Sequence, residues 1–104
     1  MSESKLATVS SIIDEIMLRA NKKSRKFTMG FEETQKANQF GAIESLIFSD
    51  KIIQTLDEEE IIEFLNDVES KGSKVFSVDS TTDLGLRVSG LGGIVSLLRF
   101  PINS

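Results

Sequence analysis

A near-continuous apolar segment in the middle of the chain places the strongest constraint on the fold. Residues 42–49 read Ala-Ile-Glu-Ser-Leu-Ile-Phe-Ser, which is typical of a strand that is covered on both faces. Residues 74–80 predict a second buried strand, and residues 94–100 predict a third that ends before Pro101. Strands of this kind need helices on both sides of their sheet, so the sequence indicates an α/β fold.

Helical periodicity occupies the segments before and between these strands. The sequence predicts four helices: residues 9–20, residues 31–40, a helix that starts at the capping-box pair Thr55 and Glu58 and ends at Gly72, and residues 83–90. In the first helix, apolar residues at three- and four-residue spacing define the expected inner face: Val9, Ile12, Ile13, Ile16, Met17 and Ala20. The connections have the lengths of right-handed crossovers, which favours a mostly parallel sheet. We expect one domain over residues 9–104, after a linker or disordered start over residues 1–8.

The chain has no His and no Cys among its 104 residues. A Ser-His-Asp triad, a thiol nucleophile and a thiolate or imidazole zinc site are therefore excluded. The absence of Cys also fits a reducing compartment. Every apolar run is too short to span a membrane, and the polar start of the chain is not a signal peptide. We expect a soluble cytoplasmic domain that is not an enzyme, holds no metal or other cofactor and has no membrane partner.

Two further patterns invite a catalytic interpretation, and both have a simpler structural one. The glycines at positions 90, 92 and 93 follow a predicted helix and precede a strand, which is the reverse of a phosphate-binding loop and favours a turn. The acidic residues over 57–69 fall in the first turn and on the outer face of a helix, which favours a solvated surface over a magnesium site. Metal-dependent RNA cleavage through Asp50, Asp57 and Glu58 would need these carboxylates to converge.

One basic cluster follows the first helix, in a chain whose formal net charge is −4. Its members are Arg19, Lys22, Lys23, Arg25 and Lys26. Such a cluster contacts RNA phosphates or an acidic protein surface, or it caps the helix dipole and otherwise faces solvent. The pattern alone leaves these interpretations open.

Four segments together resemble the C-terminal domain of the pelota family, the ribosome-rescue relatives of the class-one termination factor. Residues 41–50 resemble the family's strand that ends in Ser-Asp, and residues 30–37 resemble the helix before it. Residues 72–80 resemble its second strand. The ending Gly-Ile-Val-Ser-Leu-Leu-Arg-Phe-Pro over residues 93–101 is the most specific match, and its Phe-Pro pair favours pelota over the termination factor.

The resemblance implies a three-layer α/β/α sandwich like that of the ribosomal protein L7Ae group and of release factor domain 3. It implies a non-catalytic docking role in no-go decay and mRNA surveillance. The partners it implies are a translational GTPase of the elongation-factor type, the ribosome-recycling ABC-type ATPase and, through the full-length protein, the ribosome. The partner-binding residues carried over by position are Gly93, Leu98, Arg99 and Phe100.

The chain departs from the family pattern at three positions. Met29 stands where the family usually has Tyr, Thr82 where it commonly has His, and Leu86 where it has Glu. Thr82 and Leu86 fall within residues 81–90, near which the resemblance implies GTPase and ATPase contacts, and the sequence leaves open whether the three departures alter or abolish a family contact. The alternative functions are the C-terminal domain of the class-one termination factor and an L7Ae-like RNA-binding domain that uses the basic cluster.

Overall fold

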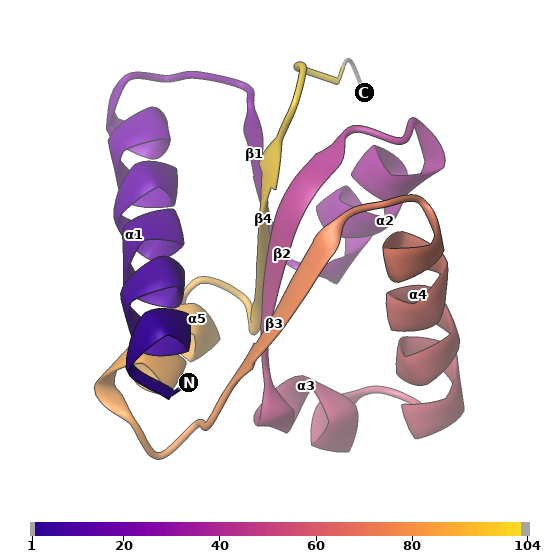
Figure 1. The fold of residues 1–104 in the computed structure, drawn as a ribbon. Helices are drawn as coiled ribbons and strands as arrows, with labels where there is room; N and C mark the ends of the chain where they lie inside the picture. The colour runs from indigo at the N-terminus through magenta and orange to yellow at the C-terminus, as the bar shows by residue number, and fades with distance from the viewer. Residues whose placement is uncertain (1, 103–104) are drawn as a thin grey trace.

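The computed structural model describes residues 2–102, with side chains for residues 7–102, and shows one sheet between two helical layers (Figure 1). The elements follow one another as α1 (Ser2–Asn21), β1 (Phe27–Met29), α2 (Phe31–Gln39), β2 (Ile43–Ser49), α3 (Asp50–Thr55), α4 (Glu58–Ser70), β3 (Lys74–Val78), α5 (Asp83–Gly90) and β4 (Ile94–Leu98). This order confirms the predicted α/β class.

The sheet is mixed, so the prediction of a mostly parallel sheet was wrong. The strand order is β1-β4-β2-β3, and β4 runs antiparallel to both of its neighbours, whereas β2 and β3 are parallel. The reason lies in the last connection. Helix α5 has eight residues, roughly 12 Å of rise, and the N–H of Gly93 bonds the carbonyl of Val88 directly after it. The chain therefore enters β4 at the edge of the sheet where β3 ends. Strand β4 consequently runs in the direction opposite to that of β2 and β3.

Two hydrophobic clusters hold the three layers together. Helices α1 and α5 cover one face, where Ile13 and Ile16 pack with Ile47 and Val95 of the sheet. Helices α2, α3 and α4 cover the other face, where the buried residues include Ala37, Leu46, Ile52, Ile61, Leu65, Ile94 and Leu98. Figure 1 shows α1 and α5 on one side of the strands and α2 and α4 on the other. Each face of the sheet is thus buried, as the apolar strands require.

The N-terminal segment differs from its expectation. Helix α1 starts at Ser2, whereas residues 1–8 were expected to be a linker or disordered start. The sequence before Val9 contains neither Gly nor Pro, and residues such as Lys5, Leu6 and Ala7 are good helix formers, so the helix extends upstream. Met17 also differs, because the residue is 43% exposed although we expected it on the inner face.

Two elements and one cap were not foreseen. Strand β1 has only three residues, and α3 has only six. The N-cap of α4 is Asp57, whose carboxylate accepts a hydrogen bond from the N–H of Glu59 at 2.9 Å. Thr55, the predicted cap, instead belongs to α3, and its hydroxyl donates to the carbonyl of Lys51. The prediction of a Thr55–Glu58 capping box was therefore wrong.

Candidate docking surface

The carboxyl end of β4 changes from buried to exposed within two residues. All five residues of β4 are buried, and Leu98 is only 1% exposed. Arg99 and Phe100 follow directly and are exposed, and Phe100 as a whole residue is 44% exposed. The N–H of Arg99 donates to the carbonyl of Ala42 at 2.7 Å, which fixes the backbone here. The side chains of Arg99 and Phe100 are thus presented to solvent from a rigid base.

Gly93 does not join this surface. It lies at the opposite end of β4, five residues before Leu98, a separation of roughly 17 Å in an extended strand. Its φ of +84° is strained for any other residue, and a Cβ there would come within 3.1 Å of Ile52 Cδ1. Its carbonyl accepts a hydrogen bond from the N–H of Ser49 at 2.9 Å. Gly93 therefore shapes the entry to β4 and lies far from the exposed pair.

Leu98 contributes through its backbone. Its side chain is buried in the core cluster under α2 and α4, where no partner reaches it. Its N–H donates to the carbonyl of Lys26 at 3.0 Å, and its carbonyl accepts a bond of 3.3 Å from Arg19 Nη1. These contacts bring the basic cluster next to the end of β4, so two groups of predicted site residues share one end of the molecule.

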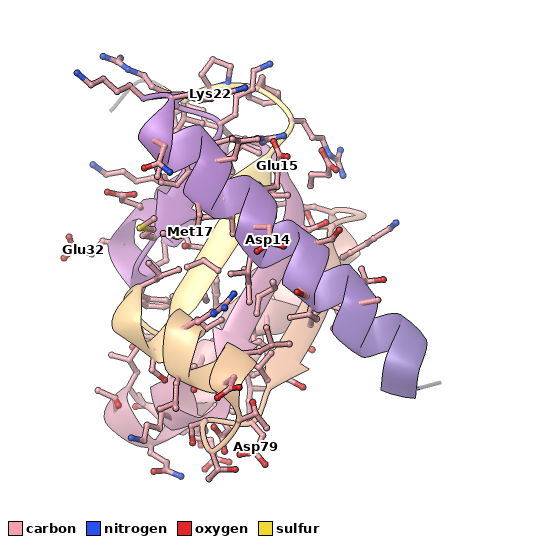
Figure 2. All side chains as sticks on the ribbon, turned by 90° about the vertical axis from the view of Figure 1, so that its left-hand side faces the viewer. Asp14, Glu15, Met17, Lys22, Glu32 and Asp79 are labelled. Carbon is pink, nitrogen blue, oxygen red and sulfur yellow. The ribbon has the colours of Figure 1, made fainter. Side chains whose placement is uncertain are left out.

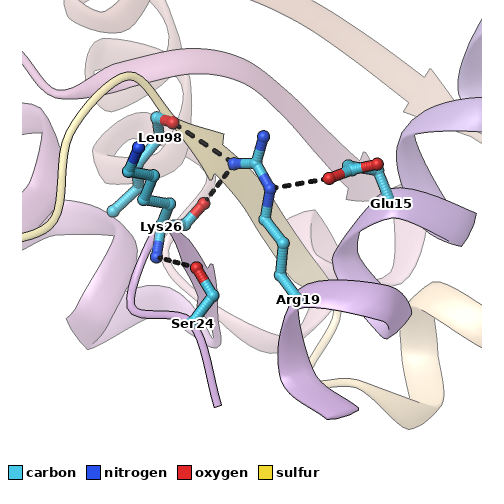
Figure 3. Close-up of polar contacts among 5 residues, drawn as sticks. All are labelled: Glu15, Arg19, Ser24, Lys26 and Leu98. Atoms are coloured by element: carbon cyan, nitrogen blue, oxygen red, sulfur yellow. Dashed lines mark hydrogen bonds and ion pairs between the residues drawn. The ribbon is translucent and has the colours of Figure 1, made fainter. Parts of the chain in front are cut away.

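The guanidinium of Arg19 forms hydrogen bonds within the chain. Its Nη1 donates to the carbonyl of Lys26 at 2.7 Å as well as to that of Leu98, and its Nε pairs with Glu15 Oε2 at 2.9 Å (Figure 3). The side chain is only 22% exposed. Arg19 thus joins α1 to β4 and to the segment before β1, so it holds the surface in shape. The Glu15–Arg19 spacing of four residues is the only sequence signal of this role.

The other four basic residues face solvent. We call Lys22, Lys23, Arg25 and Lys26 the basic turn; all four are exposed. The turn begins with hydrogen bonds from the N–H of Ser24 to the carbonyl of Arg19 and from the N–H of Lys23 to that of Ala20. This is the Schellman pattern that closes many helices. Figure 2 shows Lys22 at one end of the molecule and Asp79 at the other.

The glycine and carboxylate patterns have structural roles. Gly92 and Gly93 have φ of +111° and +84°, which confirms the predicted turn. Asp50 Oδ1 accepts a hydrogen bond of 2.8 Å from the N–H of Ser80, and this bond holds the pKa of Asp50 below its ordinary value. Among the described residues, no group of three acidic side chains lies close enough together to hold a metal ion.

The departures from the family pattern occupy defined places. Thr82 is the N-cap of α5, and its hydroxyl accepts from the N–H of Gly85 at 3.1 Å. Leu86 is 60% exposed and lines a groove of about 440 Å³ between α1 and α5. Met29 lies in β1 opposite Val95. In the part of the chain that the structure describes, no helix is both long and apolar enough to cross a membrane.

Comparison with known proteins decides the family. Residues 6–102 match the family model described as eRF1 domain 3. The chain belongs to this family. A pelota homolog of Nitrosopumilus maritimus is 71% identical over 104 residues, and the match covers the whole chain but 30% of that protein. The family prediction from residues 30–101 is therefore confirmed.

Solved structures agree with this assignment. Pelota of Archaeoglobus fulgidus matches 99% of the chain with a TM-score of 0.89 at 30% identity, over 32% of its own length. Dom34 of Saccharomyces cerevisiae, a translation termination-like factor involved in RNA quality control pathways and interacting with Hbs1, matches with a TM-score of 0.87 at 30% identity. That match covers 99% of this chain and 29% of Dom34. The chain thus spans about 30% of the length of these relatives.

Proposed function

We propose that this chain is the protein-docking domain of a pelota-type ribosome-rescue factor and has no catalytic activity of its own. In the cytoplasm it binds an elongation-factor-type GTPase and then the ribosome-recycling ABC-type ATPase, so that the full-length factor dissociates stalled ribosomes in mRNA surveillance. The family membership and the similarity to Dom34, which interacts with Hbs1, support this proposal.

The exposure of Arg99 and Phe100 is the observation that carries the proposal. Both side chains extend from the end of a strand that is buried along its whole length. Arginine and aromatic residues are enriched in protein interfaces and supply many of their strongest contacts. A rigid base also lowers the entropy lost on binding. Arg99 and Phe100 are therefore the residues through which we expect direct contact, while Leu98 and Gly93 act by shaping the strand.

The main alternative is the C-terminal domain of the class-one termination factor. The 71% identity to a pelota homolog and the TM-score of 0.89 against a pelota structure favour the rescue factor. The L7Ae-like RNA-binding alternative rests on the basic turn, which lies beside the end of β4 but does not include Arg99 or Phe100.

The proposal is tested by capture from cell extract. The tagged chain is incubated with extract that has been treated with RNase, and the bound proteins are identified by mass spectrometry. We expect the elongation-factor-type GTPase or the ribosome-recycling ATPase among them, because the contact is between proteins. The Arg99→Glu variant should lose these partners, since it reverses the charge at the exposed strand end.

Lys51→Glu is the matched control, because Lys51 is an exposed cation on α3, away from the end of β4. It should capture the same partners as the unchanged chain. Equal capture by all three proteins would show that Arg99 is not part of the docking surface. Failure of the unchanged chain to capture either partner would refute the proposed function.

A further inference from the structure

The basic turn is a charged surface that the docking role leaves unused. Lys22, Lys23, Arg25 and Lys26 are exposed, and within the described residues none of their side chains forms an ion pair. Other cations of the chain do find partners, as Arg19 does with Glu15 and Lys71 with Asp67. The turn therefore concentrates four positive charges in five residues of a chain whose net charge is negative. Of the four, Arg25 lines a cavity of about 580 Å³ together with Glu32 and Glu33, so Lys22, Lys23 and Lys26 are the cations farthest from acidic neighbours along this turn.

Lys23 occupies a position that favours glycine. Its φ is +58°, which makes it a left-handed residue at the point where the Schellman pattern closes α1. Glycine is the usual residue at this point, because it carries no Cβ and pays no steric penalty there. A lysine at this position lowers the stability of the fold. The positive charge of Lys23 is therefore explained by binding rather than by folding. Strained positions of this kind cluster at functional sites.

The turn is also held rigidly against the sheet. The carbonyl of Lys26 accepts hydrogen bonds from Arg19 Nη1 at 2.7 Å and from the N–H of Leu98 at 3.0 Å. The N–H of Lys26 donates to Ser24 Oγ at 3.3 Å (Figure 3). Because the backbone of the turn is fixed at both ends, binding requires no further ordering of the backbone, and only the four side chains lose rotamer freedom.

The helix dipole accounts for only part of this cluster. A cation is favoured in the last turn of a helix, and Arg19 fills that role in α1. Lys22 and Lys23 lie just beyond the helix end, and Arg25 and Lys26 are further away than the dipole acts. The charge of Arg25 and Lys26 is therefore not explained by the stability of α1.

The chemistry of the turn favours phosphate as the ligand. Residues 21–26 read Asn-Lys-Lys-Ser-Arg-Lys, so every side chain is polar and none offers an apolar anchor. Protein interfaces are depleted of lysine and rich in aromatic residues, whereas contacts to a nucleic-acid backbone come from lysine, arginine and small polar residues. We propose that the basic turn binds backbone phosphates of RNA. The choice of RNA over DNA rests on the proposed function, whereas the phosphate contact does not.

The test is a binding titration of the whole chain with a fluorescein-labelled RNA hairpin, followed by fluorescence anisotropy at several salt concentrations. Four phosphate contacts predict that log affinity falls with log salt at a slope of about −3 to −4. The variant Lys22→Glu/Lys26→Glu should bind at least about tenfold more weakly at low salt, with a slope reduced by about 2. Circular dichroism checks that the variant keeps its fold.

The control is Lys51→Glu/Arg87→Glu, which changes the net charge by the same amount on exposed residues of α3 and α5. It should bind the hairpin within about twofold of the unchanged chain. No binding by the unchanged chain at low salt, or equal weakening in both double variants, would overturn the inference. Displacement of the hairpin by polyglutamate as readily as by unlabelled RNA would also overturn it, because the surface would then suit an acidic protein. None of these results depends on GTPase capture.

Discussion

Arg19 on α1 donates a hydrogen bond of 3.3 Å from its Nη1 to the carbonyl of Leu98, 79 residues later in the chain. The same nitrogen reaches the carbonyl of Lys26 at 2.7 Å. One guanidinium thus holds the basic turn against the end of β4. The carbonyl of Lys26 also accepts a hydrogen bond from the N–H of Leu98, so these two contacts together join the surfaces proposed above, one for protein and one for RNA.

Replacing Arg19 by lysine tests this support. Lysine lacks the planar fork that reaches two carbonyls and Glu15 together, so we expect the free energy of unfolding to fall by about 1–2 kcal/mol. Urea unfolding followed by circular dichroism measures the change. Arg87→Lys is the control, because Arg87 meets Asp14 at 3.9 Å on an exposed surface and should leave stability unchanged. An equal effect of both substitutions would contradict the role given to Arg19.

Lys23→Gly should stabilise the chain. Lys23 has a φ of +58°, where a side chain clashes with its own backbone, and glycine removes that penalty. We expect a gain of about 1 kcal/mol, or roughly 4–8 °C in the thermal midpoint of a domain this size. The same variant should weaken RNA binding by the loss of one cation. A variant that is less stable than the unchanged chain would show that Lys23 makes a compensating contact.

Gly85→Ala and Gly90→Ala should have opposite effects, although both glycines lie in α5. A Cβ at Gly85 would clash with the carbonyl oxygen of Asp79, so α5 must move, and we expect the free energy of unfolding to fall by about 1–3 kcal/mol. A Cβ at Gly90 meets nothing within 4 Å, and alanine there should gain up to about 1 kcal/mol. Differential scanning calorimetry compares the two. Unchanged stability of Gly85→Ala would contradict the close packing of α5 against the carbonyl of Asp79.

The carboxylate of Asp50 should make stability depend on acid pH. The N–H of Ser80 stabilises its charged form, so the pKa of Asp50 in the folded chain lies below the ordinary value of 3.8. The charged carboxylate of Asp50 therefore adds its full contribution to the free energy of unfolding above pH 3.8. This contribution is lost as the pH falls through 3.8 toward the pKa of the folded chain. Near neutral pH, the thermal midpoint of Asp50→Asn should be lower than that of the unchanged chain. Below pH 3.8, the midpoint of this variant should change less with pH than that of the unchanged chain.

Glu44→Gln, an exposed carboxylate of β2, serves as the control for this experiment. This variant also removes one carboxylate from the surface, but it leaves the bond between Asp50 and Ser80 in place. If Asp50→Asn and the unchanged chain lose stability in parallel below pH 3.8, the bond to Ser80 does not carry the effect.

Local patterns in the sequence were sufficient for the long elements. The spacing of Val9, Ile13 and Ile16 identified the buried face of α1, and the apolar run over residues 42–49 identified β2. The sheet order was not predictable in this way, because β1 is a three-residue strand whose pairing partner, β4, lies far along the chain. Missing β1 removed the evidence that β4 is a central, antiparallel strand.

The site was predictable in its chemistry and only partly in its geometry. The motif at the end of β4 identified Arg99 and Phe100, which are exposed, but it also included Leu98, which is buried. A strand that is covered on both faces shows no alternation of apolar and polar residues, so the sequence could not distinguish the buried Leu98 from the two exposed residues. The basic cluster was visible as a charge run, yet its division into one internal residue, Arg19, and four free cations depends on contacts with Leu98 and Lys26. Such contacts arise only when distant segments meet.

The affinity of the purified chain for an elongation-factor-type GTPase, measured by titration calorimetry, tests the central claim most directly. The GTPase of Nitrosopumilus maritimus suits this experiment, because that organism holds a 71%-identical relative. We expect saturable binding by the unchanged chain and by Lys51→Glu, and at least about tenfold weaker binding by Arg99→Glu, in line with the loss of a charged interface contact. Identical affinities for Arg99→Glu and the unchanged chain would contradict the account.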